Sequence, residues 1–429
     1  MTELAVNGGS QVWSGGWPAW PSQTPATTEN VLRCLASHRW AISGPRLEDP
    51  GFEERFAQKF ADFLGLEYCV PTANGSSGLV IALEALDIGI GDEVIVPGLT
   101  WVASASTVMA VNALPVVVDV DGRTMCIDPE AVRAAIGPRT RAVNVVHLYN
   151  NVCDLTALRE LCRRHGLALI EDCAQAHGAA WEGRKVGGWG DIGAFSMQQT
   201  KLLTAGEGGA ATTRDEALYR RMYQLRSDGR SRVQVPRPGE MELSMLGEVM
   251  GSNYCMSELS AAVLLAQLQE LPRQNTHRAA NAQRLDALLE QLPGVAPVQA
   301  LPQVTERTHY YYTFRIDPAA FADHTAPTIA AALRAETGAQ FHPVYPPLSR
   351  HPLLRPGSKR RYQGIQNLRS MEKAHLPEAE RAHRECVTLH HSALLAEPER
   401  MQVIADAIEK VQRHADRLVA IPDSGRSPL

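Results

Sequence analysis

A carboxylate and an amine mark the two ends of one chemically suggestive stretch. Asp172 closes an apolar run of the kind that predicts a buried strand, and Lys201 stands further along, just before the glycine-rich turn of residues 205–209. In an open α/β sheet, ligands are handled where strands end. Taken singly, such an aspartate is usually a cap and such a lysine a solvated charge. Their combination favours a site, because three further polar residues lie between them, namely Gln175, His177 and Ser196.

This order of residues resembles the lysine segment of pyridoxal-phosphate (PLP) aminotransferases of fold type I. More narrowly, it resembles the DegT/DnrJ/EryC1/StrS family, which aminates keto-sugars and ketocyclitols. The resemblance implies that Lys201 holds PLP and then shuttles protons, while Asp172 keeps the ring nitrogen protonated, because an opposite charge favours the charged form. It assigns Ser196 to the phosphate. Gln175 cannot act as a base, so we expect it to hydrogen-bond near the ring oxygen or a substrate hydroxyl.

A predicted strand over residues 68–72 runs into Gly75, Ser76 and Ser77 and then into a helix. The first N–H groups of a helix are unpaired and attract anions. Ordinary helix capping by Ser76 or Ser77 is the alternative. The resemblance assigns this turn to the PLP phosphate. It also assigns Trp101, at the next strand–helix junction, to stacking on the pyridine ring, although an aromatic there is normally a core residue.

A second group of polar residues follows the predicted strand of residues 141–148. We expect His147, Tyr149 and Asn150 to line a polar pocket for a polyhydroxylated substrate. Members of the family commonly carry a glycine soon after this tyrosine, whereas this chain has Asn150 and Asn151. The two asparagines add polar groups at the place where we expect the substrate to bind.

The segment Gly251-Ser252-Asn253-Tyr254-Cys255-Met256 resembles a motif of the family whose asparagine reaches the phosphate from the partner subunit. The resemblance therefore implies a homodimer with an active site shared across the interface, and it assigns Asn253 to the cofactor. The family usually has arginine where this chain has Cys255. The preceding residues 228–251 read as a surface loop, with a substrate lid as the alternative.

Two stretches narrow the class of substrate that the resemblance implies. The run from Phe341 to Leu348 and the run from Ser196 to Lys201 resemble most closely the glutamine-dependent aminotransferases of scyllo-inosose and 2-deoxy-scyllo-inosose. The implied reaction moves an amino group from L-glutamine or L-glutamate to a keto-cyclitol, in aminoglycoside-type antibiotic biosynthesis.

Three alternatives stay open. The acceptor is a nucleotide-linked keto-sugar, or the chain is a lyase like 3-amino-5-hydroxybenzoate synthase, whose segment has histidine where this chain has Gln175. The third is a non-catalytic binding subunit, against which the intact Asp172, Ser196 and Lys201 weigh.

Composition fits an ordinary globular enzyme, with 45% hydrophobic and 21% charged residues and a net charge of −5. It offers no basic footprint for nucleic acid. The chain shows neither a signal-like start nor an apolar run of membrane-spanning length, so we expect a cytoplasmic protein without a membrane partner. The eight cysteines are scattered, and His390 and His391 point to opposite faces if they lie on a strand. We therefore expect no metal site.

Strands alternating with helices between residues 68 and 172 predict βαβ units and a mostly parallel sheet. The predicted architecture is the α/β, PLP-dependent transferase fold type I, with a large domain and a smaller C-terminal α/β domain. The expected division is an irregular N-terminal arm (1–30), lying on a neighbouring subunit or loosely ordered; a PLP-binding domain (31–270); a bridging helix with the small domain (271–421); and a disordered tail (422–429).

Overall fold

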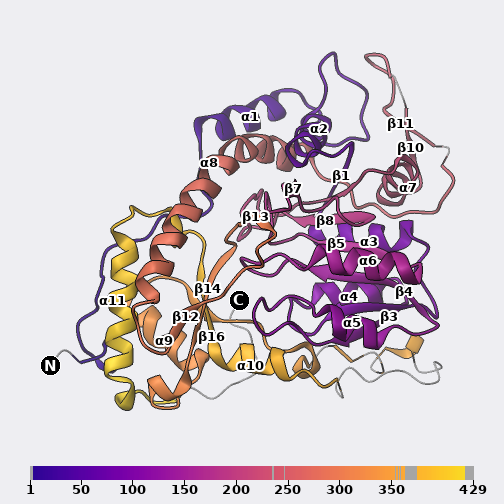
Figure 1. Cartoon of the computed structure of the whole chain (residues 1–429). Coiled ribbons are helices and arrows are strands. Elements are labelled where there is room, and N and C mark those ends of the chain that lie inside the picture. The colour runs from indigo at the N-terminus through magenta and orange to yellow at the C-terminus, as the bar shows by residue number, and fades with distance from the viewer. Residues whose placement is uncertain are drawn as a thin grey trace.

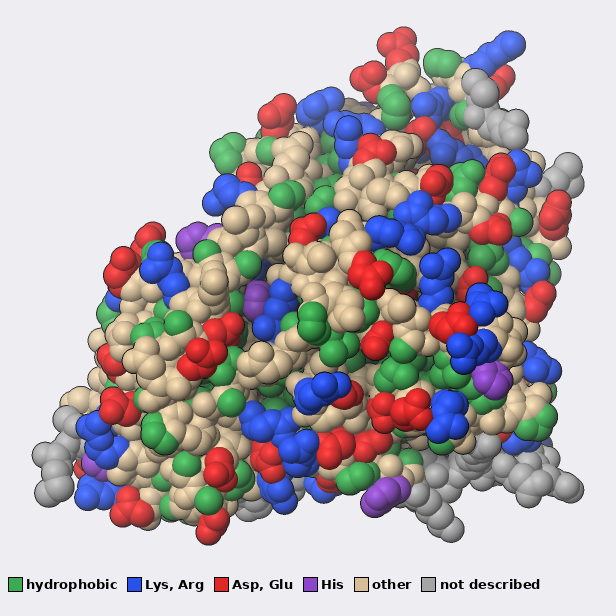
Figure 2. All heavy atoms as spheres, viewed as in Figure 1, with side chains coloured by type: hydrophobic (Ala, Val, Ile, Leu, Met, Phe, Trp, Pro, Cys, Tyr) green, Lys and Arg blue, Asp and Glu red, His purple; other side chains and the backbone are tan. Residues whose placement is uncertain are grey.

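The computed structural model describes residues 3–233, 236–245, 247–352, 354–355, 357, 359–362 and 374–420, so the predicted tail lies outside the described residues. Two α/β units, a large and a small one, are joined by the long helix α8 (Glu258–Leu289), which runs obliquely from one to the other (Figure 1). Among the described helices, none is both long and apolar enough to span a membrane. Acidic and basic side chains are interspersed over the face shown in Figure 2.

A seven-stranded sheet in the order β1-β9-β8-β5-β4-β2-β3 forms the centre of the large unit. The pairs from β8 to β3 are parallel, and β9 runs antiparallel to both β8 and β1. The predicted mostly parallel sheet is confirmed. The carboxyl ends of β4, β5 and β8 consequently share one edge, where ligands gather in such sheets. The strands are β1 Tyr68–Thr72, β2 Glu93–Pro97, β3 Leu114–Val118, β4 Thr140–Val146, β5 Ala168–Asp172, β8 Ile192–Ser196 and β9 Gly209–Thr213.

Helices cover both faces of this sheet, because the strands are apolar on both sides. Neighbours such as Leu169 and Ile170 point to opposite faces and join different hydrophobic clusters. One face carries α3 (Gly75–Ala85), α4 (Ala103–Ala110) and α7 (Glu216–Arg226). The other carries α2 (Phe52–Leu64), α5 (Pro129–Ala135), α6 (Leu155–His165) and the first half of α8.

The small unit is a four-stranded antiparallel sheet in the order β12-β14-β16-β15, which packs on helices. Tyr312 and Phe314 enter its core, whereas Tyr311 joins the core of the large unit. The elements are β12 Val295–Pro297, β14 Tyr311–Ile316, β15 Phe341–Pro343, β16 Cys386–His390, α9 Ala326–Thr337, α10 Pro377–Glu385 and α11 Arg400–Arg413. The remaining strands are short and form two small sheets, β10-β11 and β13-β6-β7. Their bounds are β6 Ala180–Trp181, β7 Arg184–Lys185, β10 Ser231–Arg232, β11 Leu243–Ser244 and β13 Val304–Glu306.

The predicted irregular arm of residues 1–30 is too long, because α1 (Pro25–Ala36) already begins inside it. Thr24 caps this helix, and Pro25 fits its first position, where no N–H is needed. We call residues 3–24 the N-terminal strap. It packs on its own chain: Leu4 is fully buried in the core of the small unit, and Figure 1 shows the strap running beside α11.

Candidate active site

Asp172 ends β5 with its carboxylate buried. Its Oδ2 accepts a hydrogen bond from Ser104 Oγ at 2.8 Å, and its Oδ1 accepts one from the N–H of Ala174 at 3.1 Å. Burial raises the pKa of this carboxyl, although the two hydrogen bonds and the charge of Lys201 act in the opposite direction. Since a buried carboxylate with too little compensation favours a cation beside it, Asp172 is suited to hold a positively charged ring nitrogen.

Ser104, the partner of Asp172, was not predicted. It lies on α4, three residues after Trp101, and its hydroxyl also bonds Thr100 Oγ1 at 3.0 Å. The side chain of Asn144, on β4, donates to the Ser104 carbonyl at 3.3 Å. The carboxylate is thus oriented by a chain of side chains from three elements. The sequence holds no local signal for this hydrogen-bonded network, because Ser104 lies 40 residues from Asn144 and 68 residues from Asp172 along the chain.

Lys201 lies half-buried in the loop between β8 and β9. Its Nζ is 4.1 Å from the centre of the Tyr310 ring, a cation–π contact that orients the amine. The same loop is tied to this ring by a 2.9 Å hydrogen bond between Thr200 Oγ1 and the Tyr310 hydroxyl. Burial and the charge of Lys201 together lower the pKa of His177 to about 3. Asp172, His177 and Lys201 therefore belong to one electrostatic neighbourhood.

The turn before α3 forms an anion cradle beside the end of β8. Asn74 caps the helix, since its Oδ1 accepts from the N–H of Ser77 at 2.8 Å and from the Ser77 hydroxyl at 3.0 Å. The alternative of a cap by Ser76 or Ser77 is wrong, because Asn74 is the cap, and Ser76 is exposed. A Cβ on Gly75 would lie 2.6 Å from the Cβ of Ser196, so only glycine allows this approach. The helix N-terminus and the Ser196 hydroxyl therefore face one small space.

An aromatic wall stands beside this cradle. Trp101 is 41% exposed, and its ring centre is 6.0 Å from that of Tyr345, which stacks on Tyr149 at 5.3 Å. Gln175 joins the wall, because its Oε1 accepts from the Tyr149 N–H at 2.7 Å and its Nε2 donates to the Tyr345 hydroxyl at 3.4 Å. Tyr149 has a φ of +57°, uncommon for a bulky residue. Tyr345 belongs to the run from Phe341 to Leu348, but its place in the aromatic wall was not predicted.

His147 does not open toward this wall, contrary to expectation. The ring is fully buried, its Nε2 is 3.2 Å from Glu171 Oε2, and its Nδ1 accepts from the N–H of Cys153 at 3.2 Å. Both ring nitrogens are occupied, so the structure gives it a supporting role. Asn150 is also buried, but its Oδ1 has no hydrogen-bond partner among the described residues, which leaves one polar group free for a ligand.

His147, Glu171 and Cys173 bring three potential metal-binding atoms within 4.8 Å of one another. Glu171 follows the alternation of the strand and points away from Asp172. Its oxygens accept from the backbone N–H groups of three residues at 2.7–2.9 Å, and these bonds and His147 hold the pKa of its carboxyl below its usual value despite burial. The geometry is that of a buried hydrogen-bonded network. The three N–H donors are Gly187, Trp189 and Gly190.

Asn253 is exposed, and its Oδ1 accepts from the N–H of Cys255 at 3.2 Å. The segment is fixed to the turn before α3, because the Tyr254 carbonyl accepts from the N–H of Ala73 at 2.7 Å. The preceding residues 228–251 carry β10 and β11 and three exposed methionines. A lid role for them stays a prediction. The methionines are Met241, Met245 and Met250.

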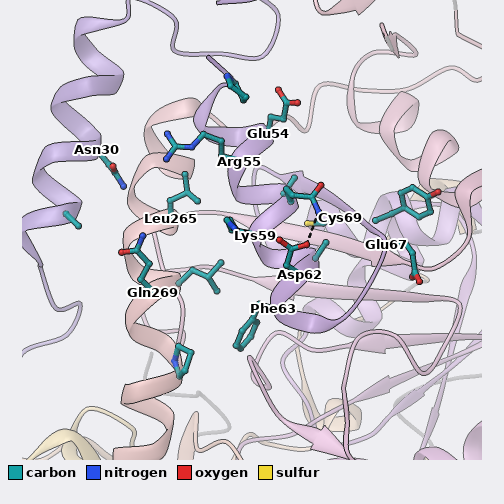
Figure 3. A pocket seen from close by; sticks show the side chains of 18 of the residues that line it. Asn30, Glu54, Arg55, Lys59, Asp62, Phe63, Glu67, Cys69, Leu265 and Gln269 are labelled. Carbon is teal, nitrogen blue, oxygen red and sulfur yellow. Dashed lines mark hydrogen bonds and ion pairs between the residues drawn. The ribbon is translucent and has the colours of Figure 1, made fainter. Parts of the chain in front are cut away.

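A cavity of about 1250 Å³ lies elsewhere, between α1, α2 and α8. Figure 3 shows Arg55, Lys59 and Asp62 on one wall and Leu265 and Gln269 on another. Its described lining includes none of the predicted site residues.

Comparison with known proteins agrees with this geometry. The model of the DegT/DnrJ/EryC1/StrS aminotransferase family matches residues 22–409. An L-glutamine:2-deoxy-scyllo-inosose aminotransferase of Streptoalloteichus tenebrarius is 50% identical over 97% of this chain and 99% of its own. An L-glutamine:scyllo-inosose aminotransferase of Streptomyces griseus is 45% identical over 96% and 97%. The crystal structure of 3-amino-5-hydroxybenzoic acid synthase superposes with a TM-score of 0.80, at 30% identity over 92% of this chain and 98% of that one.

Proposed function

The chain belongs to the DegT/DnrJ/EryC1/StrS aminotransferase family, and on this premise we propose that it moves the amino group of L-glutamine to the ketone of 2-deoxy-scyllo-inosose or scyllo-inosose. One observation carries the proposal: relatives that share 45–50% of their residues over nearly the whole length use this donor and these acceptors. The 3-amino-5-hydroxybenzoic acid synthase shares only 30%. The proposed setting is aminoglycoside-type antibiotic biosynthesis.

The enzymes of this family depend on PLP, and the residues of this chain fit it. Asp172 offers a buried carboxylate that lacks a full cationic partner, and the cradle of Gly75, Ser76 and Ser196 suits a phosphate. Trp101 presents an exposed ring face at the same edge. When bound, PLP supplies an electron sink that stabilises negative charge at the α-carbon of an amino donor.

The residues of the chain then have separate tasks. Lys201 Nζ would hold the cofactor, and the same amine would carry the proton to and from the reacting carbon. Asp172 keeps a positive charge on the ring nitrogen. The wall of Trp101, Tyr149 and Tyr345 orients flat or ring-shaped groups, and we propose that Gln175 and Asn150 hydrogen-bond to the cofactor or to substrate hydroxyls.

The test is the visible absorption spectrum of the purified, PLP-loaded protein. L-Glutamine is expected to bleach the visible band, and 2-deoxy-scyllo-inosose or scyllo-inosose is expected to restore it in the same sample. L-Glutamate serves as the competing donor. A band that L-glutamine does not bleach would contradict the proposed donor.

The remaining outcomes separate the other candidates. Restoration only by a nucleotide-linked keto-sugar would replace the proposed acceptor. Release of water and aromatisation of a cyclic substrate would indicate a lyase. A protein that forms no band with PLP would favour a non-catalytic binding subunit.

We also propose that the enzyme is a cytoplasmic homodimer whose site is completed by Asn253 of the neighbouring copy. The exposed Asn253 lies close in sequence to three exposed methionines, and methionine is enriched in interfaces between subunits. All eight cysteines are unpaired, which suits a reducing compartment.

The shared site predicts complementation between inactive variants. Lys201→Ala and Asn253→Ala homodimers, mixed and allowed to exchange subunits, are expected to regain activity, because each mixed dimer contains one site with both native residues. Statistical mixing restores about a quarter of the sites of a symmetric dimer. The measurement is transamination against mixing time, with each variant alone as the control. Activity that stays at the sum of the two variants would place Asn253 in its own subunit's site.

A further inference from the structure

The loop that carries Lys201 receives little support from regular secondary structure. Residues 197–208 form turns and bends between β8 and β9, and Gly206 has a φ of +84°. After the lysine, Leu202 and Leu203 anchor the loop in the core of the large unit. A reacting amine has to be placed to within about 0.5 Å. The position of Lys201 therefore depends on what holds the residues just before it.

Two carbonyls before the lysine are bonded by side chains from outside the large unit. The indole Nε1 of Trp20 donates to the Gln199 carbonyl at 3.0 Å, and His391 Nε2 donates to the Thr200 carbonyl at 3.0 Å. Trp20 belongs to the N-terminal strap, and His391 directly follows β16. Their rings meet edge to face with centres 4.5 Å apart. The two donors thus form one contact surface against the loop.

Trp20 is itself held from behind by α8. The buried guanidinium of Arg278 lies 5.1 Å from the centre of its ring. Nearby, Gln267 Nε2 donates to the Ser22 carbonyl at 2.6 Å, and Gln274 Nε2 donates to the Ser22 hydroxyl at 3.2 Å. The strap is therefore fixed by α8 at Trp20 itself and at Ser22, two residues later, so the indole is a defined support.

We infer that Trp20 is a positioning residue for Lys201. Its indole N–H fixes the carbonyl of Gln199 and, together with His391, sets the place from which the lysine amine reaches the reacting carbon. The inference rests on the role proposed for Lys201. Trp20 acts through the loop backbone, since its polar atom bonds Gln199.

The test compares two tryptophans of the same strap. Trp20→Phe keeps an aromatic ring and removes the N–H. Trp17→Phe is the matched control, because Trp17 Nε1 makes an equivalent bond of 2.8 Å to the Thr337 carbonyl at the end of α9. The measurements are amide hydrogen exchange of peptides covering residues 197–204 in the PLP-loaded protein, and kcat and KM with L-glutamine.

In Trp20→Phe, exchange in this loop is expected to rise several-fold, and kcat is expected to fall about two- to tenfold, the size of one net neutral hydrogen bond. KM for L-glutamine stays unchanged, because the donor's own contacts are intact. Trp17→Phe is expected to keep the wild-type exchange rate of this loop and the wild-type kcat. His391→Phe removes the second support from a different element and is expected to loosen the same peptides.

The inference is overturned if the loop in Trp20→Phe exchanges at the wild-type rate, or if Trp17→Phe accelerates the exchange equally. The exchange data report on the loop backbone whatever Lys201 does. A failure of the lysine assignment would appear elsewhere, as retained transamination in Lys201→Ala.

Discussion

Lys201→Ala is expected to lower kcat by at least about 10³-fold, because it removes both the cofactor's amine anchor and the proton carrier, and general acid–base catalysis alone contributes about 10²–10⁴. The fold should survive, since the side chain is half-buried and the contact of its amine is a cation–π contact with the ring of Tyr310. The measurements are the rate of the half-reaction with L-glutamine, the circular dichroism spectrum and the thermal midpoint.

Lys59→Ala is the control for this substitution, because the Lys59 side chain is 69% exposed on α2. It is expected to leave the half-reaction unchanged. Small primary amines added to Lys201→Ala are expected to restore part of the proton transfer. Transamination at a near-native rate in Lys201→Ala would refute the assignment of this lysine.

Asp172→Asn is expected to retain part of the PLP and to lose about 10²- to 10³-fold in kcat, a loss typical of removing one preorganised electrostatic partner. The amide keeps the shape of the side chain, and its oxygen still accepts from Ser104 or Ala174. It cannot supply the negative charge that keeps the ring nitrogen protonated. Near-normal turnover would exclude this role.

Although Asp172→Asn is expected to lower kcat, it should not lower the stability of the PLP-free protein. Burial raises the pKa of Asp172, so the folded state holds this proton more tightly than the unfolded state does. The contribution of Asp172 to the free energy of unfolding therefore falls as the pH rises from the ordinary pKa of an aspartate to the raised pKa of the folded state. Above the raised pKa the contribution stays at its lowest level. Asp172→Asn removes this penalty, and its thermal midpoint at neutral pH should equal or exceed that of the wild type.

Glu171→Gln provides a contrasting control one residue away. Glu171 points to the opposite face and accepts from three backbone N–H groups and His147. Its substitution is expected to lower the thermal midpoint, while the visible band of the loaded enzyme keeps its pH dependence. If both substitutions affect catalysis alike, the separation of function and support along β5 is wrong.

The sequence predicted the strands and helices of the large unit closely, because buried parallel strands are continuous apolar runs bounded by turn residues. The place of Asp172 at the end of a strand followed from this pattern, whereas Ser196 came only from the resemblance to the family. His147 was misplaced, because nothing local shows that Glu171 takes up its ring. Ser104, Tyr310 and Trp20 were missed for another reason: their roles arise from contacts between residues far apart in the chain, which periodicity does not encode.

The α8 helix contributes side chains to the hydrophobic cores of both units. Leu264, Leu268 and Leu271 of this helix lie in the core of the large unit, while Leu285 and Leu289 lie in that of the small one. The boundary expected near residue 270 therefore falls inside a helix that both units share. A fragment ending at residue 270 would interrupt this helix and lose Leu271 from the core of the large unit, so gene fusions and domain exchanges between relatives should keep α8 whole.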